Sequence, residues 1–252
     1  MLEIGLKLWS SNLSFIPVAQ RLYDQGLYRY IELYSVPGTF SDHIGPWKRL
    51  PMPFVIHAPH SGHGVNLSRP ECAAANTKLI AEARRFADEL ESEWIILHPG
   101  VAGNIDETVR QIKTIADSRL LIENKPYFSV YDHAVCNGYS PRDIRHVMDE
   151  TGLGFCLDFS HALSAANALK VDHREWLAQF AQMNPRMFHL SDGDNDGVDD
   201  KHLSLGQGSY DLPEIVAFLP GSAKVTLETE KDEGLQRFQA DVRALDAARG
   251  AA

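Results

Sequence analysis

The sequence has few cysteines and no long apolar run. Cys72, Cys136 and Cys156 are an odd number of cysteines without the paired spacing of a disulfide framework. No apolar stretch approaches the roughly 20 residues that a bilayer-spanning helix needs, and the N-terminus has no basic-then-apolar signal layout. We therefore expect reduced thiols, no membrane span and a cytoplasmic protein.

A linker is also missing, because no Pro/Gly/Ser-rich or low-complexity tract divides the chain. Its 252 residues, 44% of them hydrophobic, suffice for one large core, and we expect one domain over residues 1–252. The formal net charge of −10 argues against a general nucleic-acid or anionic-membrane binder. Bound divalent cations would offset much of that charge in one pocket, so the charge is weak evidence about a polyanionic substrate.

Short apolar runs alternate with amphipathic segments along the whole chain. We expect strands at 2–8, 30–34, 52–57, 94–98, 119–123, 153–158, 186–191 and 223–228. Helical periodicity is clear in Leu79, Ala83, Phe86 and Leu90, and Ser140 before a proline is a good helix start. This alternation predicts an α/β fold with a parallel sheet, whose simplest closure is a (β/α)8 TIM barrel. An open doubly wound sheet is the alternative, although no G-x-G-x-x-G follows the first run.

Most of the apolar runs end in a histidine or a carboxylate. In a parallel barrel the carboxyl ends of all strands open onto one rim, where such folds place their chemistry. Two further pairs are Asp158-x-x-His161 and Asp200-x-His202. The first places an imidazole one turn after a carboxylate at a strand end. In the second, both side chains lie on the same side of the chain if the loop is extended. The nine candidate metal ligands are His57, His98, Glu123, Asp158, His161, His189, Asp200, His202 and Glu228.

Mixtures of imidazole and carboxylate suit Zn²⁺, Mn²⁺ or Fe²⁺ better than Mg²⁺ or Ca²⁺. A single histidine at a strand end is more often structural, so the joint pattern on one rim carries the inference. Nine candidates exceed what one ion needs and fit two or three ions.

Several motifs resemble a known family. They are HAP (His57), LHPG (His98), IEN (Glu123), GFCLDFSHA (Asp158, His161), FHLSD (His189), DKHLSLGQG (Asp200, His202) and LET (Glu228). Over residues 52 to 230 the chain resembles the xylose isomerase-like TIM-barrel superfamily. Within it, the chain is most similar to endonuclease IV (AP endonuclease family 2), the metal-dependent abasic-site phosphodiesterase.

This resemblance implies a trinuclear zinc cluster in which one glutamate is shared by two ions. The three ligand sets would be His57, His98 and Glu123; Glu123, Asp158, His189 and Glu228; and His161, Asp200 and His202. The implied activity is that of a hydrolase, in which a metal-bound hydroxide attacks a phosphoester.

The loops that would grip DNA differ from the family pattern. The loop after the first strand, WSSNLS, is short, and the loop after the second, YSVPGTF, contains no Arg or Lys for phosphate contacts. An acidic stretch at 192–197 would repel a DNA backbone. We therefore expect a small phosphorylated or sugar substrate, with abasic DNA as the less favoured partner and no obligate protein partner.

A sugar or sugar-phosphate isomerase or epimerase is the alternative activity. In relatives with that chemistry, two Glu, one Asp and one His hold one divalent ion, as Glu123, Asp158, His189 and Glu228 would here. Glu123 and Glu228 would then be the catalytic acid and base on opposite faces of a ketose. His57, His98, Asp200 and His202 would then contact substrate instead of metal.

Four other residues near the predicted rim have two interpretations each, and Trp9 has one. Glu32 would orient a ligating histidine or be a plain rim charge, and Lys125 would bind a phosphate or face solvent. His60 and His63 would line the pocket or lie exposed in a loop. For Trp9 we expect a place in the pocket wall.

Overall fold

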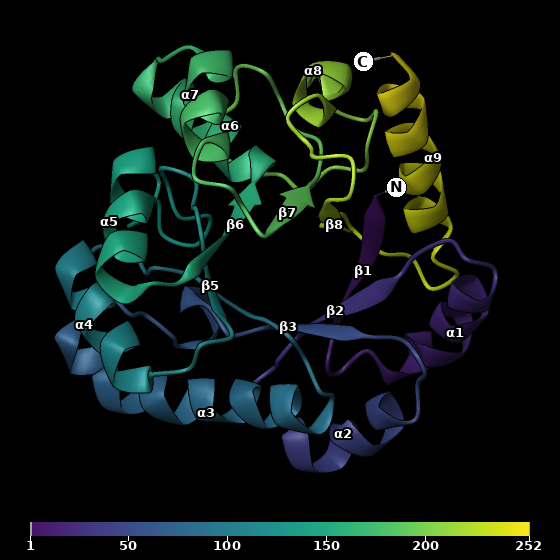
Figure 1. The fold of residues 1–252 in the computed structure, drawn as a ribbon, viewed down its shortest axis with the longest axis horizontal. Helices are drawn as coiled ribbons and strands as arrows, with labels where there is room; N and C mark the ends of the chain where they lie inside the picture. Colours follow the sequence, from purple (N-terminus) through teal and green to yellow (C-terminus); the bar gives the residue numbers. More distant parts are fainter. Residues whose placement is uncertain (1, 252) are drawn as a thin grey trace.

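A closed barrel of eight parallel strands, paired in chain order from β1 to β8, forms the centre of the computed structural model, which describes residues 2–251 (Figure 1). The pairing of β1 with β8, with Glu3 opposite Lys224, closes it. This confirms the predicted (β/α)8 fold. The strands are β1 (Glu3–Trp9), β2 (Tyr30–Tyr34), β3 (Phe54–His57), β4 (Ile95–Leu97), β5 (Leu120–Glu123), β6 (Gly154–Asp158), β7 (Met187–Leu190) and β8 (Lys224–Leu227).

The helices form an outer ring around the strands (Figure 1). Two of them, α6 and α7, lie between β6 and β7, where one helix was expected, and α8 is short. The helices are α1 (Ile16–Asp24), α2 (Phe40–Lys48), α3 (Ala73–Glu89), α4 (Ile105–Ile115), α5 (Pro141–Thr151), α6 (Phe159–Leu169), α7 (His173–Ala181), α8 (Leu212–Val216) and α9 (Gln236–Ala251).

Two helix starts show how local chemistry places these elements. Ser140 caps α5 by accepting a hydrogen bond from the backbone N–H of Asp143, and Pro141 occupies the first helical position, as predicted. Asp158 ends β6 and also caps α6, because its Oδ1 accepts from the backbone N–H of His161 at 2.7 Å. One carboxylate therefore couples a strand end to the helix that carries the next candidate ligand.

The barrel interior is filled by an apolar layer below its carboxyl end. Gly5 on β1 leaves room there for the Tyr30 ring, since a Cβ on Gly5 would lie 2.4 Å from Tyr30 Cζ. Cys156 on β6 belongs to this layer. The layer consists of Tyr30, Val55, Ile96, Leu121, Cys156 and Met187.

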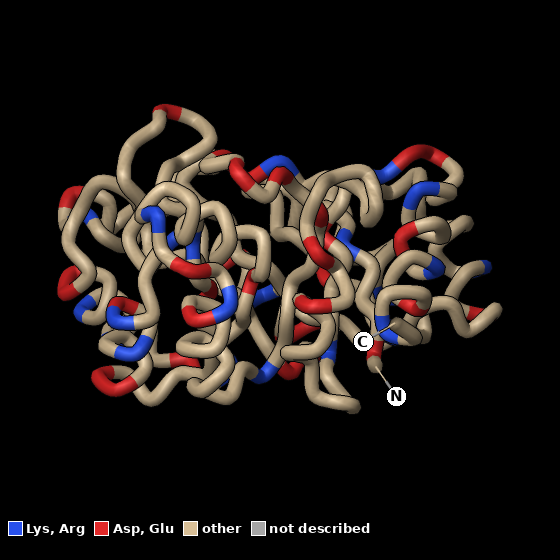
Figure 2. Tube along the Cα trace, turned by 90° about the horizontal axis from the view of Figure 1, so that it is seen from above, with Lys and Arg blue, Asp and Glu red and all other residues tan. Residues whose placement is uncertain are grey.

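The surface has mixed charge. Figure 2 shows acidic and basic positions interspersed along the trace. Among the helices of residues 2–251, none combines the length and the apolar character of a bilayer-spanning segment.

Candidate metal centre

A ring of polar side chains lies directly above the apolar layer. Successive residues of a strand face opposite sides, so a residue two positions after a member of the apolar layer also points into the barrel interior. We call the residues at this next level the polar layer. They are Lys7, Glu32, His57, His98, Glu123, Asp158, His189 and Glu228. Because of this alternation, polar side chains from the ends of all eight strands point into one site inside the barrel.

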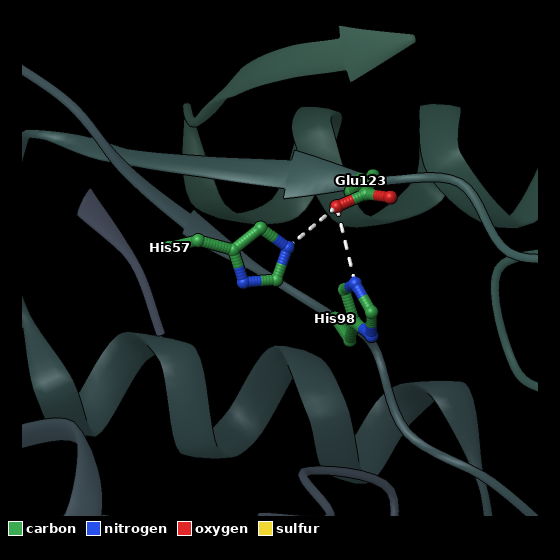
Figure 3. Close-up of side chains that lie close together, drawn as sticks. All are labelled: His57, His98 and Glu123. Atoms are coloured by element: carbon green, nitrogen blue, oxygen red, sulfur yellow. Dashed lines mark hydrogen bonds and ion pairs between the residues drawn. The ribbon is translucent and has the colours of Figure 1, made fainter. Parts of the chain in front are cut away.

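Glu123 lies between two histidines from neighbouring strands (Figure 3). Its Oε2 is 3.2 Å from His57 Nε2 and 3.1 Å from His98 Nε2. The three residues, one of the ligand sets implied by the resemblance, offer ligand atoms close enough together to hold one metal ion.

The other oxygen of Glu123 faces a second group of residues. Its Oε1 lies 3.5 Å from His189 Nδ1, which is also 2.8 Å from Glu228 Oε2 and 3.7 Å from Asp158 Oδ2. Glu123, Asp158, His189 and Glu228 form a second possible ligand group. Glu123 thus belongs to two groups at once.

The third group comes from a helix and a loop. His161 Nε2, in the first turn of α6, lies 3.1 Å from Asp200 Oδ2, and His202 Nε2 contacts the same oxygen. The loop is not extended at His202, which has a left-handed backbone (φ +49°), yet the side chains of Asp200 and His202 lie together. Non-glycine residues in that conformation concentrate at functional sites.

Four of the five histidines have their far nitrogen held by an acceptor. Nδ1 donates a hydrogen bond to a carbonyl oxygen in three of them: His57 to Ala58, His161 to Asn124 and His202 to Glu228, each at 2.8 Å. His189 instead donates from Nε2 to Glu32 Oε2 at 2.8 Å. Such bonds set the ring orientation and leave the other nitrogen free for a metal.

Glu32 therefore has the orienting position that was one of its two predicted roles. Its second oxygen, Oε1, pairs with Lys7 Nζ at 3.0 Å, and Lys7 also lies 2.7 Å from Glu228 Oε1. Burial opposes the charge on Lys7, but these two carboxylates outweigh burial and raise its pKa. Sequence reasoning missed Lys7, although its position two residues after Gly5 follows the same strand alternation.

The ionisation of the centre depends on its internal pairs. Burial opposes the charge on Glu123, but His98 and His189 outweigh burial and hold its pKa well below the usual range. Burial likewise disfavours the imidazolium forms of His161 and His202. Nearby carboxylates outweigh it and raise the pKa of His161 to about 10 and that of His202 to about 9.

Several buried polar atoms in these groups lack a hydrogen bond, counting residues 2–251. They include Asp200 Oδ1, and three atoms that have ion-pair contacts alone: Glu123 Oε1, His189 Nδ1 and Glu228 Oε2. Buried polar atoms without partners are costly, and clustered carboxylates repel one another. Within each group the candidate ligand atoms lie within 4.8 Å of one another. The donor set and its clustered carboxylates therefore fit divalent cations.

A cavity of about 540 Å³ opens above the centre. Trp9, His60 and Lys125 line it, as does Lys231, which sequence reasoning missed. Burial lowers the pKa of Lys231 to about 8, and its Nζ donates to the carbonyl oxygen of Leu227 at 3.1 Å. His63 supports the wall by bonding through Nδ1 to Tyr34 Oη at 2.8 Å.

The fold and this centre define a class of protein: a (β/α)8 barrel with histidines and carboxylates converging at its carboxyl rim. The chain belongs to the xylose isomerase-like TIM-barrel family, whose model matches residues 48–248. The resemblance stated from the motifs is thereby confirmed.

Two relatives illustrate the range of the family. An uncharacterized protein of Methanocaldococcus jannaschii is 26% identical over 186 residues, which are 67% of this chain and 60% of that protein. A probable endonuclease 4 of Mycobacterium bovis is 24% identical over 204 residues, 77% of this chain and 79% of that protein.

Solved structures share the fold along nearly the whole chain. Endonuclease IV of Thermus thermophilus has a TM-score of 0.74 at 20% identity and covers 99% of this chain and 100% of its own. A D-tagatose 3-epimerase-like protein has a TM-score of 0.73 at 18% identity and covers 99% of both chains. The IOLI protein with a zinc atom has a TM-score of 0.65 at 13% identity, covering 98% of this chain and 96% of its own.

Proposed function

We propose that this protein is a metal-dependent hydrolase of small phosphoesters. Its centre would hold two to three Zn²⁺ or Mn²⁺ ions through the nine residues predicted from the sequence. The observation that carries the proposal is the presence of three adjacent ligand groups, two of them sharing Glu123 and each with at least one residue that lines the same cavity. A one-ion isomerase would need the second group alone.

Bound divalent ions would supply a nucleophilic water at neutral pH and offset the negative charge of a phosphoester. The chain's own residues would prepare the site. Glu123 presents one oxygen to each of two ligand groups, so its carboxylate can hold two cations in a defined relation. Glu32 keeps His189 in the tautomer whose Nδ1 faces the carboxylates. Burial of the carboxylates excludes competing water and strengthens these interactions.

The names of one sequence relative and one structural neighbour support this proposal. One sequence relative is a probable endonuclease 4, and a structural neighbour carries zinc. Both agree with a centre rich in imidazole, which suits zinc.

A sugar isomerase or epimerase is the second candidate. Glu123 and Glu228 both belong to the ligand group around His189, so a single ion could lie between a possible acid and base. A cavity of about 540 Å³ suits a monosaccharide, and a structural neighbour is named as a D-tagatose 3-epimerase-like protein.

One parallel assay separates these activities. Protein loaded with Zn²⁺ or Mn²⁺ would be tested with bis(p-nitrophenyl) phosphate, a panel of ketoses and an abasic DNA duplex, alongside measurement of bound metal. We expect phosphodiester hydrolysis with two to three metal equivalents per chain. Ketose epimerisation with one equivalent would establish the second candidate instead, and cleavage confined to abasic DNA would contradict a small substrate.

Removing one histidine of the first ligand group should remove one metal ion. We expect His57→Ala and His98→Ala each to lose about one equivalent and more than about a hundredfold in phosphodiesterase activity, since even loss of an outer-shell partner costs 10–100-fold. His146→Ala, which changes an exposed histidine on α5, is the matched control. Turnover that persists with one metal fewer would make the two residues substrate contacts.

Metal loading should release protons. His161 and His202, with pKa values of about 10 and 9, carry protons at pH 7.5 and must lose them to bind a cation. We expect at least about two protons released per chain and tighter binding as the pH rises toward 9. Zinc titration calorimetry in Pipes and in Tris would show this as a difference in heat. Equal heats in both buffers would contradict it.

The proposed setting follows from the same features. The substrate would be a small phosphorylated or sugar compound in the cytoplasm, where Cys72, Cys136 and Cys156 would stay reduced, as they are unpaired here.

A further inference from the structure

Exposed apolar side chains concentrate at the mouth of the cavity. Large exposed apolar residues within 2–251 are Trp9, Val130, Tyr131, Val135 and Val171. Trp9, Val130 and Tyr131 line the cavity, and Val135 belongs to the same segment after β5. Exposing such side chains costs free energy, and their gathering at one opening is typical of a binding surface.

These residues extend an aromatic wall that leads down to the metal centre. We define this wall as Trp9, Tyr34, His60 and Tyr131. Ring centroids are 5.4 Å apart between Trp9 and Tyr34, 5.2 Å between Tyr34 and His60, and 5.9 Å between His60 and Tyr131. Tyr34 also lies 5.3 Å from the ring of His57, a candidate ligand.

The outer rings of the wall are available to a ligand. Trp9 is 46% exposed and Tyr131 is 64% exposed. Tyr131 is supported from below by Gly62, where a Cβ would lie 2.5 Å from Tyr131 Cζ. Its position thus depends on the absence of a side chain at residue 62, while the remaining ring surface faces the opening.

Lys125 lines the cavity beside the third ligand group. Lys125 Nζ is 3.4 Å from His161 Nε2, and among residues 2–251 no carboxylate lies within 4.0 Å of it. Lys7, in contrast, is paired with two carboxylates. A metal ion at the His161 group and the ammonium of Lys125 would repel each other, and an anion between them would relieve that repulsion.

We propose that the cavity binds a small organic phosphate that carries a flat aromatic ring. The phosphate lies between Lys125 and the metal centre, and the ring stacks on Trp9 and Tyr131. This inference rests on the proposed phosphoester function and narrows its substrate class to compounds of mononucleotide size. A volume of about 540 Å³ is within the usual range for ligands of that size, and base–aromatic stacking stabilises such complexes.

Adenosine 5′-monophosphate and ribose 5-phosphate form a matched pair of probes, because they share the ribose and the 5-phosphate and differ at C1, which carries adenine in the first and a hydroxyl in the second. Binding of each to zinc-loaded and to metal-free protein would be measured by calorimetry. We expect the nucleotide to bind at least about tenfold tighter to the zinc-loaded protein. Trp9→Ala and Tyr131→Ala should bring the ratio close to one without weakening ribose 5-phosphate. Lys125→Ala should weaken both probes alike.

Val171→Ala, which truncates an exposed apolar residue outside the cavity, should leave both affinities unchanged. Equal binding of the two probes by the unaltered protein would overturn the proposal. So would a Trp9→Ala protein with an unchanged thermal transition that still prefers the nucleotide. If the preference holds but bis(p-nitrophenyl) phosphate is not hydrolysed, the ring site stands and the proposed hydrolase function fails.

Discussion

Glu123→Gln should lower kcat/KM for bis(p-nitrophenyl) phosphate by at least about a thousandfold. Loss of one transition-state electrostatic contact costs about 10²–10³-fold, and Glu123 serves two ligand groups. Oε2 faces His57 and His98, while Oε1 lies 3.1 Å from His161 Nδ1 and 3.5 Å from His189 Nδ1. Glutamine keeps the shape of the side chain but removes the charge that two cations would share.

The same variant should lose one to two metal equivalents, measured by mass spectrometry of gently purified protein. Glu150→Gln is the matched control, because Glu150 is exposed and pairs with Lys113 across the surface. A Glu123→Gln protein with full metal content and activity within tenfold of the original would contradict the shared role.

Removing the metal should lower the thermal transition by at least about 10 °C. A ligand present at 1,000 times its Kd stabilises a protein by about 4 kcal/mol, and each kcal/mol moves the transition of a chain this size by about 2–4 °C. Without cations, the carboxylates of Glu123, Asp158, Asp200 and Glu228 are buried together with little compensation beyond Lys7 and the histidines. Scanning calorimetry with a strong chelator, followed by ZnCl₂, would measure the loss and its recovery.

Raising the pH should destabilise the metal-free protein further. His161 and His202 have pKa values raised to about 10 and 9, so the stability they contribute as cations is fully present below about pH 6.5 and is lost as the pH rises through 9 to 10. Zinc-loaded protein should not show this loss.

For the chelation experiment the Glu123→Gln protein serves as the control, because chelation should shift its thermal transition by less than half as much. A transition unmoved by chelation would contradict a buried metal centre.

Strand alternation explains how much of this site could be predicted. A residue two positions after a buried core residue on the same strand must face the same interior, and this places His57, Glu123 and Asp158 above Val55, Leu121 and Cys156. The apolar runs likewise located all eight strands. The rule applies equally to Lys7, whose place was missed because it follows a glycine instead of a large apolar residue.

The sequence by itself determined the barrel and the residues of its polar layer, since both follow from the two-residue period of a strand. The tertiary structure decided the contacts that the two-residue period does not determine, which are those made by loops and between distant segments. It brought Asp200, in the loop after β7, to His161 in α6, and it placed Lys7 between Glu32 and Glu228. It also gathered Trp9 and Tyr131, 122 positions apart in the chain, at one opening. Contacts between distant segments depend on how loops fold over the strand ends, and that is set by packing and not by local periodicity.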